Sequence, residues 1–296
     1  MAANRRTLKQ ALRRHQPALF AKANVLGVGI GEKVTAGRAT GKICLKVYVE
    51  KKLPLSKLTT GNIIPPKLGT VLTDVEEVGK IRAFANTSRQ RPAKGGASIG
   101  HYKITAGTLG CLVTDQRARR LILSNNHVLA NSNGATLGDP ILQPGPYDGG
   151  KVGPDTIATL VKFQRIRFRG EPNVVDCALA EPVDASLVSS EISEIGAPKG
   201  TIAARRGMSL QKSGRTTGHT FGKVKDVDAS IKVDYDGKTG VFVNQILTTA
   251  MSQGGDSGSL VLNDQKQAVG LLFAGSDAVT ILNPIEKVCE VLGVTL

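Results

Sequence analysis

The sequence predicts a mostly β protein, in which a small basic α+β domain precedes a larger domain of short strands. From about residue 101 to 285, short apolar runs such as RLILSNN and TIATLVKF alternate with segments rich in Gly, Pro, Asn and Asp. This spacing is typical of an all-β barrel or sandwich. The charge is also unevenly divided, because residues 1–100 hold 19 Lys and Arg against 5 Asp and Glu, and residues 101–296 hold 20 against 19. Two units with different partners are therefore expected.

The elements of the first domain follow from local patterns. Residues 4–22 place Leu8, Leu12 and Leu19 on one face of an amphipathic helix, which we expect Pro17 to interrupt. Apolar residues alternate on both sides of a polar, Gly-containing tip in residues 24–54, which indicates a β-hairpin. The glycines of GVGIG fit a glycine-rich strand better than a nucleotide-binding loop, because their spacing is not GxGxxG and no helix follows.

The domain boundaries are drawn from composition. Residues 88–100, SRQRPAKGGASIG, contain no large apolar residue except Ile99 and are interpreted as a linker. The basic α+β domain then covers residues 1–87, with a role in recruitment or regulation, and the strand-rich domain covers residues 101–296. A short helix is expected near the end, at NPIEKVCEVLG.

Composition excludes several function classes. Trp is absent and aromatic residues make up 4% of the chain, which disfavours nucleic-acid binding by base stacking. No apolar run approaches the length of a membrane span. The four cysteines, Cys44, Cys111, Cys177 and Cys289, lie far apart and suggest buried thiols in a reducing compartment. We therefore predict a cytoplasmic protein without a membrane span.

The basic N-terminal domain has three interpretations. Its positive charge indicates an acidic partner: a protein, a nucleic-acid backbone or a membrane surface. It is equally compatible with a solvated surface that aids solubility, or with self-assembly into a homo-oligomer.

The segment GGDSGS is the strongest candidate for chemistry. A serine hydroxyl attacks carbonyls only when a histidine takes its proton, and that histidine benefits from an orienting carboxylate. Of the four histidines, His127 follows the apolar run RLILSNN and so lies at a strand end, where catalytic groups usually lie on β scaffolds. Ser257, in the centre of the glycine-rich turn, is the expected nucleophile.

The acid partner of His127 is expected at Asp176. This residue lies in the apolar stretch NVVDCALAEP, where burying a carboxylate requires a hydrogen-bond donor such as a histidine ring. Asp155, which follows Gly-Pro in a turn, is the alternative. We expect the glycine-rich turn to form an oxyanion hole with the backbone N–H groups of Gly255 and Ser257.

The chain order His127, Asp176, Ser257 resembles that of the chymotrypsin-like serine peptidases, in which the nucleophile also lies in a GDSG turn. LSNNHV and DCALA are similar to the histidine and aspartate segments of HtrA-type proteases. SGRTTGHTFGKV is similar to a hairpin of α-lytic and streptogrisin-type enzymes. The long segment that begins at SNNHV also resembles trypsin-like proteins of the plant narrow-leaf type. The resemblance implies that residues 101–296 form a trypsin-like double β-barrel.

The resemblance also implies a specificity pocket. Its floor falls on Met251 and its wall on Phe273, Ala274 and Gly275. An uncharged floor disfavours Lys or Arg before the scissile bond and favours an apolar or small residue. The partner of Asp256, which many relatives pair with a new N-terminus after activation cleavage, is not evident from the sequence. A switch of the turn by a binding partner is one hypothesis.

In this family the cysteines of the histidine segment and of the SGRTTG hairpin form bridges. This chain has Val128, Gln211 and Phe221 at those places, which again suggests a reducing compartment. Taken together, the patterns predict an intracellular serine endopeptidase that cleaves a protein or peptide substrate through an acyl-enzyme, with no metal or organic cofactor. The alternative is a catalytically quiet trypsin-fold scaffold with a basic binding domain.

Overall fold

The computed structural model describes residues 5–35, 37–79 and 86–296. The chain divides into an N-terminal unit, Met1–Ala83, and a C-terminal unit, Phe84–Leu296. None of the helices within the described ranges is long and apolar enough to cross a membrane.

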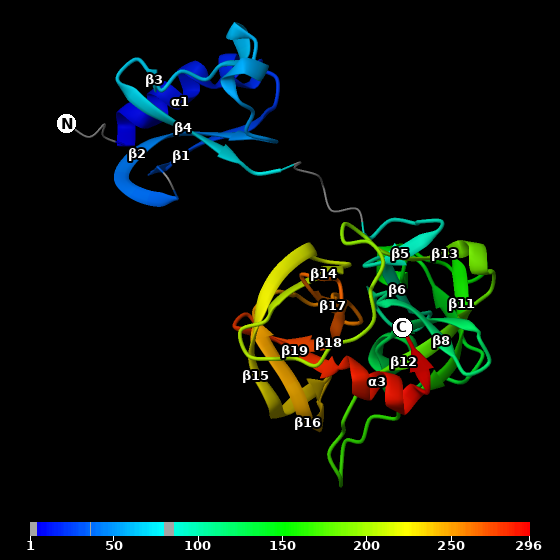
Figure 1. The fold of residues 1–296 in the computed structure, drawn as a ribbon. Helices are drawn as coiled ribbons and strands as arrows, with labels where there is room; N and C mark the ends of the chain where they lie inside the picture. The colour runs from blue at the N-terminus through cyan, green and yellow to red at the C-terminus, as the bar shows by residue number, and fades with distance from the viewer. Residues whose placement is uncertain (1–4, 36, 80–85) are drawn as a thin grey trace. The chain divides into compact units, whose positions relative to one another are not determined.

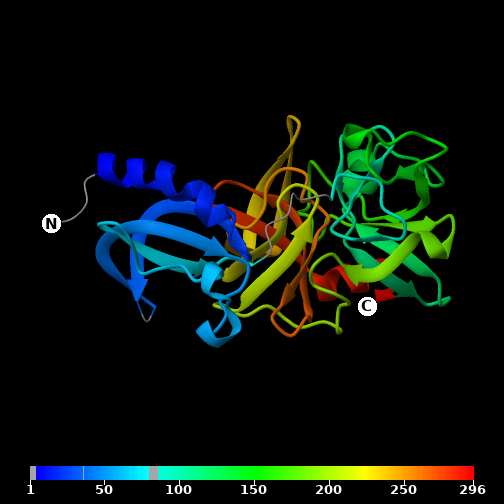
Figure 2. The ribbon, with the colours of Figure 1, turned by 90° about the horizontal axis from the view of Figure 1, so that it is seen from above.

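The N-terminal unit is a helix on a four-stranded sheet (Figures 1 and 2). Strands β1 and β2 form the expected antiparallel hairpin, β2 pairs in parallel with β4, and β3 is the far edge strand. The elements are α1 (Arg5–Phe20), β1 (Val25–Thr35), β2 (Arg38–Val49), β3 (Lys67–Leu68) and β4 (Val71–Glu77), with 3-10 turns at Leu55–Lys57 and Thr60–Asn62.

Its core lies between α1 and the sheet. Leu8 from the helix packs with Leu45 and Val71 from β2 and β4, and all three are buried. The glycines of β1 have a packing role: a Cβ on Gly27 or Gly29 would lie 3.1 or 3.0 Å from the Tyr48 side chain. The bare face of β1 at these glycines therefore makes room for the Tyr48 ring, as a glycine-rich strand allows.

The helix differs from the expected one at Pro17. The prediction that Pro17 interrupts it was wrong, because α1 runs from Arg5 to Phe20 with Pro17 inside. Proline removes one backbone donor, but Leu19 beyond it is only 2% exposed. We attribute the continuation to the burial of this last turn, which offsets the missing hydrogen bond.

The C-terminal unit contains two curled sheets (Figure 1). One sheet has the strand order β20-β8-β9-β12-β11-β10-β6-β7, and the other is a closed barrel, β14-β15-β16-β19-β18-β17. The mostly β fold class is thus confirmed.

The strands and helices of the first sheet and its surroundings are β5 (Ala93–Gly95), β6 (Ser98–His101), β7 (Gly107–Thr108), β8 (Cys111–Asp115), β9 (Arg120–Ser124), α2 (Asn126–Leu129), β10 (Pro140–Leu142), β11 (Thr156–Phe163), β12 (Ala178–Pro182) and β13 (Val188–Ile192). Those of the closed barrel and the C-terminus are β14 (Ser209–Gly214), β15 (Gly218–Tyr235), β16 (Lys238–Thr249), β17 (Leu260–Asn263), β18 (Ala268–Gly275), β19 (Val279–Pro284), α3 (Ile285–Leu292) and β20 (Val294–Thr295).

The segment interpreted as a linker, residues 88–100, is part of the C-terminal unit. It contains β5, which pairs with β13, and most of β6, which pairs with β10 and β7. Ala93 and Ala97 are fully buried, and a Cβ on Gly95 would lie 2.8 Å from the Ile192 side chain. The small residues that suggested a linker are therefore required by close packing.

Besides a core of its own, each curled sheet contributes to a hydrophobic core that lies between the two. It joins Leu123 and Leu179 of the first sheet with Leu260 and Leu271 of the closed barrel, and α3 covers it with Val288. The β15–β16 hairpin extends away from this core (Figure 2). The expected C-terminal helix is present as α3, and its Val288 packs where the two sheets meet.

Candidate active site

His127 and Asp176 are brought together at the end of the first sheet. His127 lies in α2, one short turn after β9, and Asp176 lies just before β12, which pairs with β9. His127 Nδ1 is 2.6 Å from Asp176 Oδ2. The carboxylate is fully buried, whereas the imidazole is 21% exposed. The expected pair is thus present in the structure.

Asp176 is saturated with hydrogen bonds. Its Oδ1 accepts from the backbone N–H groups of Asn126 at 2.7 Å and His127 at 3.3 Å. Its Oδ2 accepts from the Tyr235 hydroxyl at 2.9 Å in addition to the His127 ring. Its own N–H donates to Asn283 Oδ1 at 2.8 Å. A buried carboxylate needs such partners to remain charged.

Asp155, the alternative acid, lies elsewhere. Its Oδ2 accepts from the Lys151 N–H at 3.0 Å, and its Oδ1 pairs with Arg89 at 3.1 Å. It therefore organises its own loop and has no hydrogen bond or ion pair with His127 in the described part of the chain.

Ser257 lies in the turn between β16 and β17, across a cavity of about 770 Å³ whose wall it shares with His127. Its Oγ donates a long 3.5 Å hydrogen bond to the Phe273 carbonyl. No hydrogen bond joins it to His127 among the described residues. Such contacts are often loose before substrate binds.

The turn around Ser257 contains two glycines in the left-handed region of the backbone. Gly255 and Gly258 have φ of +94° and +98°, a region that favours glycine. Thr108 Oγ1 donates to the Gly255 carbonyl at 2.8 Å, and Thr216 Oγ1 to the Gly254 carbonyl at 2.7 Å. These bonds fix the carbonyls, while within the described residues the N–H groups of Gly255 and Ser257 donate to no protein acceptor. Both N–H groups are thus free to bind a ligand at this turn.

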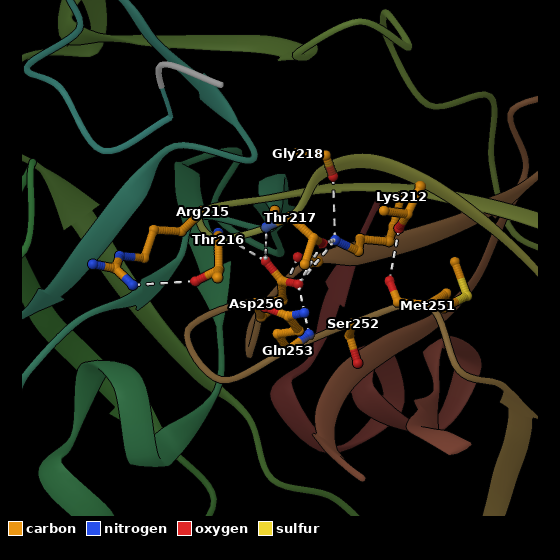
Figure 3. Close-up of polar contacts among 12 residues, drawn as sticks. Lys212, Arg215, Thr216, Thr217, Gly218, Met251, Ser252, Gln253 and Asp256 are labelled. Atoms are coloured by element: carbon orange, nitrogen blue, oxygen red, sulfur yellow. Dashed lines mark hydrogen bonds and ion pairs between the residues drawn. The ribbon is translucent and has the colours of Figure 1, made fainter. Parts of the chain in front are cut away.

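Asp256 has an internal partner that sequence analysis did not find (Figure 3). Lys212 Nζ lies 3.1 Å from Asp256 Oδ2, and both side chains are fully buried. Thr217 Oγ1 and the Gln253 N–H donate to the same oxygen at 2.6 and 2.9 Å. The backbone N–H groups of Thr216 and Thr217 donate to Asp256 Oδ1 at 2.9 and 3.1 Å. Burial lowers the pKa of Lys212, an effect that the Asp256 charge opposes. The turn is therefore held from within the closed barrel.

A second ion pair connects the two sheets beside this turn. Arg215 Nη2 and Nε contact Asp148 at 2.5 and 2.8 Å, and Ser98 Oγ donates to the same carboxylate at 2.5 Å. Burial alone would raise the pKa of Asp148, but the hydrogen bonds from Arg215 and Ser98 outweigh it and lower the pKa.

The expected pocket residues divide into two groups. Phe273, Ala274 and Gly275 line the same cavity as Ser257 and His127. Met251 is not among the residues that line it and is 5% exposed, packed in the core of the closed barrel. Ser252, beside Met251, shares a 2.7 Å hydrogen bond with Thr280. Within the described residues no His, Cys, Asp or Glu cluster could hold a metal ion.

The comparisons with known proteins concern the fold of the C-terminal unit. Residues 196–280 match the family model of peptidase S7, the flavivirus NS3 serine protease. Among solved structures, Cellulomonas bogoriensis chymotrypsin is similar at 19% identity over 69% of this chain and 97% of that chain, with a TM-score of 0.50. The C-terminal unit has the chymotrypsin-like serine peptidase fold.

Two further structures have the same chymotrypsin-like fold. The Nocardiopsis protease NAPase is 19% identical over 69% of this chain and 97% of that chain, with a TM-score of 0.51. The α-lytic protease homologue N4 is 19% identical over 68% of this chain and 97% of that chain, with a TM-score of 0.51. Comparison with curated protein sequences gives no match. The predicted resemblance to chymotrypsin-like serine peptidases is thus confirmed.

Proposed function

We propose that the protein is a serine endopeptidase whose triad is Ser257, His127 and Asp176. The observation that carries the proposal is the 2.6 Å contact between His127 Nδ1 and the fully buried Asp176, beside a cavity that Ser257 shares with His127. A carboxylate held in this way fixes the tautomer of the imidazole, so that its other nitrogen can accept the serine proton.

The reaction proceeds in two halves. Ser257 Oγ rotates about χ1 toward His127 and attacks the scissile carbonyl, while His127 takes its proton. The N–H groups of Gly255 and Ser257 stabilise the oxyanion of the tetrahedral intermediate. The intermediate collapses as His127 protonates the leaving amine, and an acyl-enzyme remains. Water then attacks the ester with His127 as base, which releases the acid and restores Ser257.

The test is covalent labelling with a fluorophosphonate, located by peptide mass spectrometry. We expect the label on Ser257 in the wild type, and no label in Ser257→Ala or His127→Ala. Ser252→Ala is the matched control, because Ser252 lies in the same loop and its Oγ is bonded to Thr280. Labelling that persists in Ser257→Ala, or its absence from every form, would overturn the proposal and favour the quiet scaffold.

We propose that the substrate residue before the scissile bond is apolar or small. The support is that Phe273, Ala274 and Gly275 line the cavity, and that a Cβ on Gly275 would lie only 3.3 Å from Ser252 Oγ. Cleavage of a peptide library, read by mass spectrometry against Ser257→Ala, tests this. A profile dominated by Arg or Lys would contradict it.

For the N-terminal unit we propose recruitment of an acidic partner. The basic residues of α1 are exposed and carry one sign of charge; they are Arg5, Arg6, Lys9, Arg13 and Arg14. Retention of the full chain on heparin should fall when Lys9 and Arg13 are both changed to Glu, and should weaken with salt. Retention that is unchanged by the double substitution and by salt would favour a solvated surface without a partner. The four free thiols support our proposal of a reducing, cytoplasmic location.

A further inference from the structure

The tip of the β15–β16 hairpin reaches the His127–Asp176 pair. The strands end at the register pair Tyr235 and Lys238, and the two residues between them, Asp236 and Gly237, have φ of 50° and 88°. Two positive φ values define the tight turn that matches the twist of a hairpin. The turn fixes Tyr235 as the last residue of β15, and its hydroxyl donates to Asp176 Oδ2 at 2.9 Å.

The hydroxyl acts on the same oxygen that holds the imidazole. Asp176 Oδ2 accepts from both Tyr235 and His127 Nδ1, whereas among the described residues Oδ1 accepts from two backbone N–H groups. The rings of Tyr235 and His127 also meet edge to face, with centroids 5.8 Å apart. Tyr235 therefore contacts both members of the pair, and it does so from the other sheet of the unit.

Packing holds the Tyr235 ring in this position. The ring lies 5.8 Å from that of Phe168 and 6.1 Å from that of Phe242, which is fully buried. Burial, together with the Asp176 charge, raises the pKa of Tyr235 far above its usual value. The phenol therefore keeps its proton and remains a donor to Asp176 across the working pH range.

We propose that Tyr235 is a positioning residue for the triad, which holds Asp176 Oδ2 in line with His127 Nδ1 and disperses the carboxylate charge. This inference rests on the proposed serine endopeptidase function. The hairpin that carries Tyr235 also contributes Lys232, Asp234 and Asp236 to the wall of the cavity. The same element thus borders the substrate and orients the acid.

The first test compares Tyr235→Phe with Tyr48→Phe. Both changes remove a hydroxyl and keep the ring, but Tyr48 lies on β2 in the N-terminal unit. We expect Tyr235→Phe to lower kcat about tenfold with KM nearly unchanged, equivalent to about 1.4 kcal/mol. The acid limb of kcat/KM should move to higher pH, because a carboxylate with one donor fewer attracts the protonated imidazole more strongly. Tyr48→Phe should leave that limb in place.

The second test does not depend on turnover. NMR titration of the His127 imidazole in the full chain, with Ser257→Ala as a common background, should show a midpoint at higher pH in Tyr235→Phe. The other charged groups at the cavity, Lys103, Lys232, Asp234 and Asp236, are the same in both samples.

The outcomes separate the two proposals. Failure of the wild type to hydrolyse any peptide would reject the endopeptidase function, while the His127 titration would still decide the role of Tyr235. An unchanged titration and unchanged kcat in Tyr235→Phe would overturn the inference. It would also fail if Tyr48→Phe reproduced both effects, since the hydroxyl bonded to Asp176 would then not be their cause.

Discussion

The buried Lys212–Asp256 pair predicts a large effect of Lys212→Met, which keeps an unbranched side chain, one atom shorter, and removes its charge. Both groups are fully buried, so Asp256 cannot replace its partner with water. Removing one member of a buried ion pair costs about 3–5 kcal/mol. Asp256 retains four neutral donors, one hydroxyl and three backbone N–H groups, which place the expected loss near the lower limit. We therefore predict that the C-terminal unit loses about 3 kcal/mol of its free energy of unfolding.

The same change should affect catalysis more than stability alone would suggest. Asp256 lies between Gly255 and Ser257, whose N–H groups form the proposed oxyanion hole. A turn that shifts to release an unpaired carboxylate moves both donors, and losing one such donor typically lowers kcat by about 10²–10³-fold. The double variant Lys212→Met, Asp256→Asn should regain part of the stability, because no charge is left buried without a counter-ion.

The assay reads each unit separately through its own thiols. Cys111 and Cys177 are buried in the C-terminal unit, and Cys44 is buried in the N-terminal unit. Thiol labelling in increasing urea, followed by peptide mass spectrometry, therefore gives one unfolding curve for each. In Lys212→Met the curves of Cys111 and Cys177 should move to lower urea, and that of Cys44 should not.

A matched control separates a buried pair from an exposed one. Lys94 pairs with Glu191 at 2.7 Å, but both side chains are about half exposed, at 43% and 53%. Lys94→Met should cost less than about 1 kcal/mol and leave kcat unchanged. If Lys212→Met were no more harmful than Lys94→Met, the reasoning that the buried pair holds the turn would be refuted.

Two further predictions concern the surroundings of the turn. Because its partnership with Arg215 keeps the pKa of Asp148 low despite burial, its stabilisation is present above the usual carboxyl pKa and is lost as pH falls through the lowered value. Asp148→Asn should therefore cost about 2–3 kcal/mol at pH 7. The cost should shrink steadily as pH falls below the usual carboxyl pKa, as measured by urea unfolding followed by circular dichroism. A cost that stays constant as pH falls would contradict this. Gly258→Ala should lower kcat about 100-fold, because φ is +98° and the new Cβ would collide with the Thr108 carbonyl. Gly200→Ala, with φ of +77° but open space around it, should keep full kcat, and equal kcat losses in both variants would show that the collision is irrelevant.

Some of the site was predictable because it depends on local sequence. His127 and Asp176 each adjoin a strand rich in apolar residues, and β9 and β12 are neighbours in the sheet, so their ends meet. The glycines of GGDSGS predict positive φ, which Gly255 and Gly258 have. Strand ends and tight turns are encoded within a few residues, and sequence reasoning is strong at this range.

Lys212 was missed, although the sequence contained a usable signal. Leu210 and Lys212 are buried on β14, on either side of the half-buried Gln211. A lysine in register with inward-facing residues requires a buried anion. Asp256 was the carboxylate without an evident partner. A lysine at an inward-facing strand position and a carboxylate without a partner are together enough to suggest the Lys212–Asp256 pair from the amino-acid sequence.

Tyr235 could not have been found in this way. The Asp-Gly turn after it predicts the tip of a hairpin, but nothing local says which residues that tip will contact. Its contact with Asp176 spans 59 residues and depends on how two sheets curl toward each other. Likewise, Ala93, Gly95 and Ala97 suggested a linker because small residues are typical both of flexible segments and of the tightest packing.

Both buried carboxylates of the site bind a side-chain donor that comes from the closed barrel. Asp176 receives a hydroxyl from Tyr235 at the end of β15, and Asp256 receives an ammonium from Lys212 on β14. Both strands belong to the closed barrel, and β14 and β15 pair directly. Since each acid has its partner within the same barrel, the turn at Ser257 is held without a new N-terminus as the counter-ion of Asp256. A binding partner that switches this turn would therefore have to act against an existing buried ion pair. Lys212→Met, which lacks that pair, is the variant in which such a partner would have the largest effect.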